Sequence, residues 1–138
     1  MNVYLDSSVV LRRLRREASP FSAWATWDHA YASVLLKVET FRTIDRIRLS
    51  GKVDDDEAAA LLSRAGAMLD VIEFVPLSAA ILDRASQSFL TALGTLDALH
   101  LATALRLVEA GFAGLMFLTH DAELALAARS VSFRVEGA

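Results

Sequence analysis

The sequence contains no cysteine, which excludes a disulfide scaffold, a zinc–thiolate site and a cysteine nucleophile. Proline and glycine are also scarce, at 2 and 6 of 138 residues, while 54% of the residues are hydrophobic and 22% are charged. These proportions exclude a disordered or collagen-like chain. No apolar run approaches the roughly 18 residues of a membrane span, and no basic-then-apolar signal segment opens the sequence. We therefore expect one compact, soluble, cytoplasmic domain over residues 1–138.

Positive charge is not in excess either, because 14 Lys and Arg stand against 17 Asp and Glu, a net charge of −3. This balance argues against a protein that coats nucleic acid over its whole surface, but it leaves room for a local basic patch. Only Lys37 and Lys52 are lysines, and the other cations are arginines. Arginine suits bidentate phosphate contacts, although GC-rich coding would produce the same bias.

Hydrophobic periodicity predicts alternating strands and helices along the chain. Strands are expected over residues 2–5, 30–32, 71–75, 115–118 and 131–135. Helices are expected over residues 9–16, 21–27 and 122–129, and from the capping residues Ser33, Asp54, Ser78 and Thr95 to about residues 49, 69, 93 and 109. Gly51 and Gly111 are the expected stop signals of two of these helices. Such alternation implies an α/β fold, with a central, mostly parallel β-sheet flanked by helices on both faces.

Two acidic residues directly follow predicted strands. Asp6 follows the first strand, and Asp121 follows the apolar strand over residues 115–118. Ligands of open α/β sheets bind beyond the carboxyl ends of the strands, so both carboxylates are candidates for a binding site. Each could instead serve only as the N-cap of the helix that follows it, and the sequence leaves this choice open.

Glu39 is a third candidate, because it lies on a helical face with apolar neighbours. Leu35 and Val38 share that face at 3.6-residue spacing, so we expect Glu39 to point toward or beside the core. A partly buried carboxylate needs a cation. Arg42, three residues further on, and a metal ion are the two alternatives.

Asp97 lies in the first turn of an almost wholly apolar helix. An acid there complements the helix dipole, which is the simpler explanation. Its neighbours one and two turns on are Leu101 and Ala104, so Asp97 is also expected to point inward. Four carboxylates from distant segments would then repel one another unless a divalent cation or raised pKa values relieve the repulsion. Oxygen ligands without thiolates suit hard ions such as Mg²⁺ or Mn²⁺.

Four segments resemble the PIN-domain ribonucleases, and in particular the VapC toxins of bacterial and archaeal toxin–antitoxin pairs. They are Val3-Tyr4-Leu5-Asp6-Ser7-Ser8-Val9, residues 33–42 (SVLLKVETFR), residues 96–104 (LDALHLATA) and Leu118-Thr119-His120-Asp121. The segments occur in the order and at the spacing of that family, over essentially the whole chain. The resemblance implies a single PIN-like domain.

The resemblance also implies a chemistry and its residues. Metal-binding, catalytic carboxylates fall on Asp6, Glu39, Asp97 and Asp121, and supporting hydroxyls fall on Ser7 and Thr119. The implied reaction is endonucleolytic cleavage of RNA with Mg²⁺ or Mn²⁺. The implied partners are the RNA substrate, a VapB-type antitoxin and a second copy of the chain in a homodimer.

Contacts with RNA or an antitoxin must come from cations, because the site itself is anionic. Candidates are Arg12, Arg13, Arg15, Arg16 and Arg42, with a solvated helix face as the alternative for the four on the first helix. His100 follows Asp97 by one helical turn and either supports the site or fills the core.

Other functions remain for comparison. A PIN-domain nuclease of RNA processing would carry the same acids, although a short single-domain chain favours the toxin. A catalytically silent PIN fold used for binding would be expected to have lost some of the four acids. Receiver and phosphohydrolase folds need a lysine after a late strand, and neither Lys37 nor Lys52 is so placed.

Overall fold

The computed structural model describes residues 1–15 and 26–138. In chain order its elements are β1 (Asn2–Leu5), α1 (Ser7–Leu14), β2 (His29–Ser33), α2 (Leu35–Leu49), α3 (Asp55–Leu69), β3 (Ile72–Val75), α4 (Ala79–Ala85), α5 (Thr95–Glu109), β4 (Met116–Leu118), α6 (Ala122–Ser130) and β5 (Arg134–Glu136). Arg16 and residues 21–25 of the expected second helix lie outside the described residues. Among the helices described, none is long and apolar enough to cross a membrane.

The five described strands form one parallel sheet in the order β3-β2-β1-β4-β5. This confirms the α/β fold expected from the alternation of strands and helices. The chain adds β2 and β3 on one side of β1 and then returns to add β4 and β5 on the other side. The order in which strands are added therefore reverses between β1 and β4. Open α/β sheets bind ligands at such switch points.

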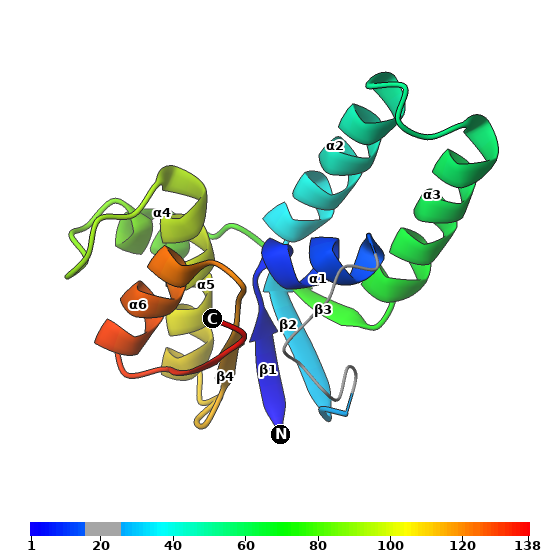
Figure 1. Cartoon of the computed structure of the whole chain (residues 1–138). Coiled ribbons are helices and arrows are strands. Elements are labelled where there is room, and N and C mark those ends of the chain that lie inside the picture. Colours follow the sequence, from blue (N-terminus) through cyan, green and yellow to red (C-terminus); the bar gives the residue numbers. More distant parts are fainter. Residues whose placement is uncertain (16–25) are drawn as a thin grey trace.

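Alternating side chains of β1 pack on opposite faces of the sheet. Val3 and Leu5 belong to the core on the side of α1, α2 and α3. Tyr4 points to the other side, where its ring stacks on Phe117 with centroids 5.2 Å apart and packs with Leu101 of α5. Figure 1 shows the two groups of helices on the two sides of the sheet. Both faces are thus covered, which is why residues 3–5 of β1 and all of β4 are buried.

Helix ends mostly follow the local signals in the sequence. Asp54 and Glu57 form the expected reciprocal capping box at the start of α3. Gly51 and Gly111 follow α2 and α5 with φ values of 74° and 107°, a left-handed conformation that glycine adopts without strain. Two predicted caps are wrong. Thr95 is the first residue of α5, and Gly94 takes the N-cap position without a side-chain bond. Ser33 ends β2, and Val34 is the N-cap of α2.

Two elements have an end that differs from the prediction by more than two residues. Helix α4 ends at Ala85 rather than near residue 93. Phe89 and Leu93 instead belong to an irregular segment that packs against the core around Tyr4, on the α5 side of the sheet. The Arg84 guanidinium lies 4.2 Å from the centre of the Phe89 ring and holds that turn. Strand β5 begins at Arg134 rather than at residue 131, because residues 131 and 132 form the turn after α6.

Candidate active site

Asp6 joins β1 to α1 at the switch point of the sheet. Its carboxylate caps α1 by accepting from the Ser8 backbone N–H, so the simpler capping explanation holds. The same carboxylate also accepts from two hydroxyls: Oδ2 lies 2.6 Å from Ser8 Oγ and 2.9 Å from Thr119 Oγ1. Only 4% of Asp6 is exposed. A charge buried to this degree is stable only with such donors.

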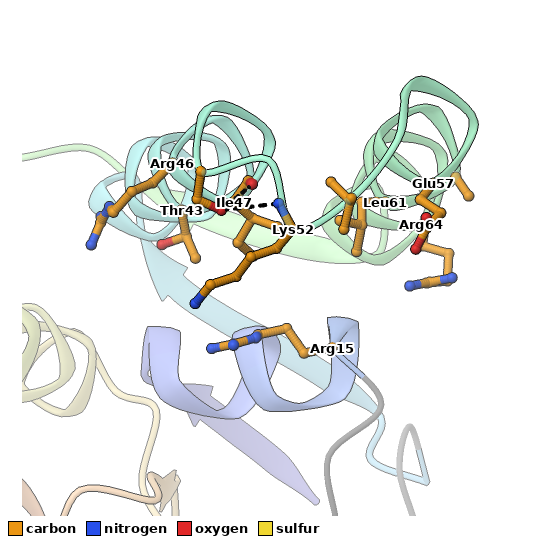
Figure 2. A pocket seen from close by; sticks show the side chains of 11 residues that line it. Arg15, Thr43, Arg46, Ile47, Lys52, Glu57, Leu61 and Arg64 are labelled. Carbon is orange, nitrogen blue, oxygen red and sulfur yellow. Dashed lines mark hydrogen bonds between the residues drawn. The ribbon is translucent and has the colours of Figure 1, made fainter.

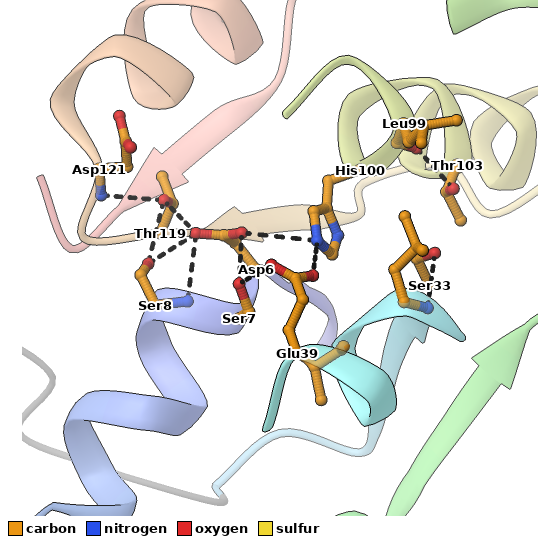
Figure 3. A network of polar contacts seen from close by, with 12 residues as sticks. Asp6, Ser7, Ser8, Ser33, Glu39, Leu99, His100, Thr103, Thr119 and Asp121 are labelled. Atoms are coloured by element: carbon orange, nitrogen blue, oxygen red, sulfur yellow. Dashed lines mark hydrogen bonds and ion pairs between the residues drawn. The ribbon is translucent and has the colours of Figure 1, made fainter. Parts of the chain in front are cut away.

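Thr119 and Ser8 connect the two halves of the site (Figure 3). Thr119, at the end of β4, donates to Asp6 and accepts from the backbone N–H of Asp121 at 3.0 Å. Ser8 Oγ accepts from the backbone N–H of His120 at 2.9 Å while donating to Asp6. The β1–α1 and β4–α6 turns are therefore held together by hydroxyls as well as by strand pairing.

Glu39 lies on α2, and the Ser7 hydroxyl lies between its carboxylate and that of Asp6. Ser7 Oγ donates to Glu39 Oε2 at 3.0 Å and lies 3.5 Å from Asp6 Oδ1, so this serine bridges the two acids. The side chain of Glu39 is 22% exposed, which confirms its position beside the core. The predicted reason for that position is wrong, however. Val38 is 57% exposed, and α2 instead buries the stripe of Leu36, Thr40 and Ile44.

The partner of Glu39 is also not Arg42, which the three-residue spacing on α2 suggested. Arg42 pairs with Asp45 on the outer surface of α2, at 2.5 Å. Glu39 Oε1 lies 2.6 Å from His100 Nε2 instead. A partner from another helix replaces the local one because Asp45 is the nearer carboxylate on the exposed face of α2.

His100 connects the acid cluster to the core of the sheet. It is 1% exposed, and its Nδ1 lies 3.1 Å from the hydroxyl of Tyr4. That hydroxyl accepts from the Ser33 backbone N–H at 3.2 Å. Burial, followed by the charge of Asp6, raises the pKa of Tyr4 well above 10, so the hydroxyl keeps its proton. Because the Glu39 carboxylate is an acceptor, Nε2 is the donor in the contact between His100 and Glu39. His100 is both a core residue and a site residue.

The charge environment of His100 has opposing parts. Burial lowers the pKa of His100, but the hydrogen bond to Glu39 and the negative charges of Asp6, Glu39 and Asp97 raise it above its usual value overall. His100 is the one described cation-forming side chain that pairs with the acid cluster.

Asp97 completes the cluster from the first turn of α5. The residues that share its face, Leu101 and Ala104, are fully buried, as predicted. Burial, then the charges of Asp121 and Asp6, raise the pKa of Asp97 to about 6. Glu39 adds to this effect. The charges of the other three predicted carboxylates therefore all reach Asp97.

Asp121 caps α6 by accepting from the backbone N–H of Leu124 at 3.0 Å. As with Asp6, the capping explanation and membership in the acid cluster hold together. One carboxylate oxygen is used by the helix, and the charge of the group reaches Asp97.

The donor set of the cluster suits a hard divalent cation. The carboxylates and the hydroxyls of Ser7 and Thr119 supply only oxygen, which Mg²⁺ and Mn²⁺ prefer. No arginine or lysine of residues 1–15 and 26–138 pairs with any of the four acids. In the same part of the chain no three His, Asp or Glu side chains converge closely enough to hold an ion. An ion would therefore require the carboxylates to draw closer together.

Three residues of this network were not predicted from the sequence as parts of a site. None of Ser8, Tyr4 and Ser33 was expected beside the acids. Ser8 has a local signal, because it follows a strand-ending acid by two residues. Tyr4 and Ser33 have none, since they reach the site through pairing of β1 with β2.

The arginines of α1 do not line the acid cluster. Arg12 and Arg13 are in the last turn of α1, and Arg15 is its C-cap. At 1.5 Å of rise per residue, they lie roughly 9–14 Å from Asp6 along the helix. A role for them in contacting RNA or an antitoxin stays a prediction.

Residues 3–130 match the PIN domain family. Since the match spans most of the chain and agrees with its fold, the chain belongs to the PIN domain family, a family of nucleases. A comparison with curated proteins found no match.

Asp97→Asn is expected to stabilise the protein at pH 7.5 by about 1–2 kcal/mol, after allowance for solvent screening. Asp97 binds its proton more tightly in the folded protein than in the unfolded chain, so its contribution to stability falls as pH rises from 3.8 to about 6. Urea unfolding with EDTA at pH 4 and pH 7.5 measures the difference between variant and wild type. A difference that does not grow with pH would contradict the mutual repulsion of the acids.

Tyr4→Phe is expected to lower the free energy of unfolding by about 1–3 kcal/mol, because it leaves the Ser33 N–H and His100 Nδ1 buried without a partner. Tyr31→Phe is the matched control on the neighbouring strand, since the Tyr31 hydroxyl bonds to the exposed Glu73. Equal losses in the two variants would show that the Tyr4 hydroxyl has no special part in the network.

Proposed function

We propose that this protein is a metal-dependent endoribonuclease of the VapC type. The observation that carries the proposal is that Asp6, Glu39, Asp97 and Asp121 all lie at the switch point of the sheet, where burial and the charges of the other three acids raise the pKa of Asp97. No described arginine or lysine neutralises this charge. Such a cluster is suited to hold a divalent cation and unsuited to hold an anion by itself.

The four carboxylates would hold Mg²⁺ or Mn²⁺. The ion, when bound, would lower the pKa of a water molecule and neutralise charge on the scissile phosphate. The chain itself supplies orientation. Thr119 and Ser8 hold one oxygen of Asp6, which leaves Oδ1 turned toward Ser7 and His100.

Glu39 is oriented from two directions. His100 Nε2 donates to Oε1, and Ser7 donates to Oε2. Because Tyr4 fixes the His100 ring, Glu39 keeps its direction without an arginine, which would lower the negative charge of the site. Carboxylates held by such outer contacts bind metals more tightly than freely rotating ones.

The toxin assignment rests on the four sequence segments rather than on the geometry. Those segments resemble VapC toxins, so we propose a VapB-type antitoxin as the protein partner and a homodimer as the assembly. A PIN nuclease of RNA processing would have the same acid cluster. Growth experiments rather than cleavage assays separate these two.

Purified protein is expected to cut total RNA into discrete fragments with Mg²⁺ or Mn²⁺ and not with EDTA. Asp6→Asn and Asp97→Asn should each reduce cleavage by about a hundredfold or more, because each removes a negative charge from the site while keeping its shape. Asp70→Asn is the control, since Asp70 is exposed and lies at the opposite edge of the sheet, before β3.

Cleavage that survives EDTA, or survives both substitutions, would contradict the proposed site. Metal binding without cleavage, seen as a rise in Tm with Mn²⁺ that Asp97→Asn reduces, would instead indicate a catalytically silent PIN fold.

Induced expression in a bacterial host is expected to arrest growth, because a toxin acts on the RNA of the cell. Asp6→Asn should relieve the arrest at equal protein level, and so should coexpression of a small DNA-binding protein encoded next to this gene. Unimpaired growth with active wild-type enzyme would favour the RNA-processing nuclease.

A further inference from the structure

A second hollow lies away from the acid cluster, between α2, α3 and the end of α1 (Figure 2). Its volume is about 700 Å³. Four cations from separate segments line it, and Glu57 is the one acid among the described residues that does. The cations are Arg15, Arg46, Lys52 and Arg64. We call this hollow the cationic groove.

Among the described residues, four cations and one acid line the cationic groove, so its lining carries a net positive charge. Glu57 is engaged at the start of α3, where its carboxylate accepts from the Asp54 backbone N–H at 3.3 Å. Within residues 1–15 and 26–138, neither Arg46 nor Lys52 forms an ion pair. Arg64 donates to the Leu14 carbonyl at 3.0 Å, which ties α3 to α1 and fixes one wall of the groove. The groove therefore attracts anions.

The cationic groove continues directly from the acid cluster. Glu39, Thr43 and Arg46 follow one another on a single face of α2 at spacings of four and three residues, and Ile47 lies on the same face four residues after Thr43. Glu39 belongs to the acid cluster, and the other three line the groove. At 1.5 Å of rise per residue, Arg46 lies roughly 10 Å from Glu39 along the helix. A polymer bound at the acids can reach the groove without leaving this face.

We propose that the cationic groove binds the single-stranded RNA that extends beyond the cleavage point. This inference rests on the proposed function, whose acid cluster repels phosphates and so needs cations elsewhere to hold the strand. Arg46 and Lys52 contact phosphates, and the apolar floor around Ile47 and Leu61 packs against sugars and bases. The volume suits a few nucleotides of one strand and not a duplex.

Binding of a fluorescent single-stranded RNA of about 12 nucleotides tests the proposal, with Asp97→Asn as the common background that prevents cleavage. Adding Arg46→Gln and Lys52→Gln is expected to weaken binding by about tenfold. It should also make the slope of log K against log salt shallower by about 0.7 for each phosphate that the variant no longer neutralises. The matched control is Arg106→Gln with Arg134→Gln, which removes the same charge from α5 and β5.

A cleavage assay without the Asp97→Asn background supplies a second readout. The groove variant should raise KM for the long RNA and leave kcat nearly unchanged, while a dinucleotide, whose single phosphate would lie at the acid cluster, should be cut normally. Equal behaviour of groove and control variants in both assays would overturn the groove while leaving the nuclease intact. RNA binding lost only in the groove variant of a protein that cuts no RNA would support the groove and refute the proposed function. An acidic protein partner that requires the groove, with RNA affinity unchanged, would overturn the proposal.

Discussion

The hydrogen bond from the Thr119 hydroxyl to the Asp6 carboxylate is the interaction on which the site depends. It joins the end of β4 to the end of β1, where the order of the sheet changes direction. A buried carboxylate needs donors, and the chain supplies them from the hydroxyls of Ser8 and Thr119 rather than from cations. Asp6 is therefore held in place while its negative charge remains. The same hydroxyl accepts from the Asp121 N–H, so the Thr119 side chain positions both Asp6 and Asp121.

The negative charge of the four carboxylates is the second constraint on the structure. Burial raises the pKa of Asp97 most, and the charges of the other acids raise it further. An ionised Asp97 therefore lowers the stability of the folded protein at neutral pH. His100 offsets part of this cost, and its ring is fixed by Tyr4 in the middle of the sheet. Cations that attract a polyanion lie instead at the far end of α2, in the cationic groove. The negative and the positive cluster therefore lie at separate points along one face of α2.

Local signals predicted most of the fold, and the exceptions have a common cause. The capping box at Asp54 and the glycine after α2 involve neighbours in sequence, so their patterns could be recognised without a structure. The end of α4 could not, because Phe89 packs against a core that other elements form. The buried face of α2 was misjudged for the same reason: which stripe faces inward depends on where α1 and α3 lie, and Val38 turned out to be exposed.

The sequence by itself determined the α/β alternation, the capping box of α3, the acids that follow strands and the inward face of Asp97, because these features depend on neighbours in sequence. Only the tertiary structure decided the partners. Glu39 pairs with His100 from α5 and not with Arg42 one turn away, since packing of α5 against β2 brings the histidine to it. This contact joins residues that are 61 positions apart. It depends on how the helices pack on the sheet, which no local sequence pattern records.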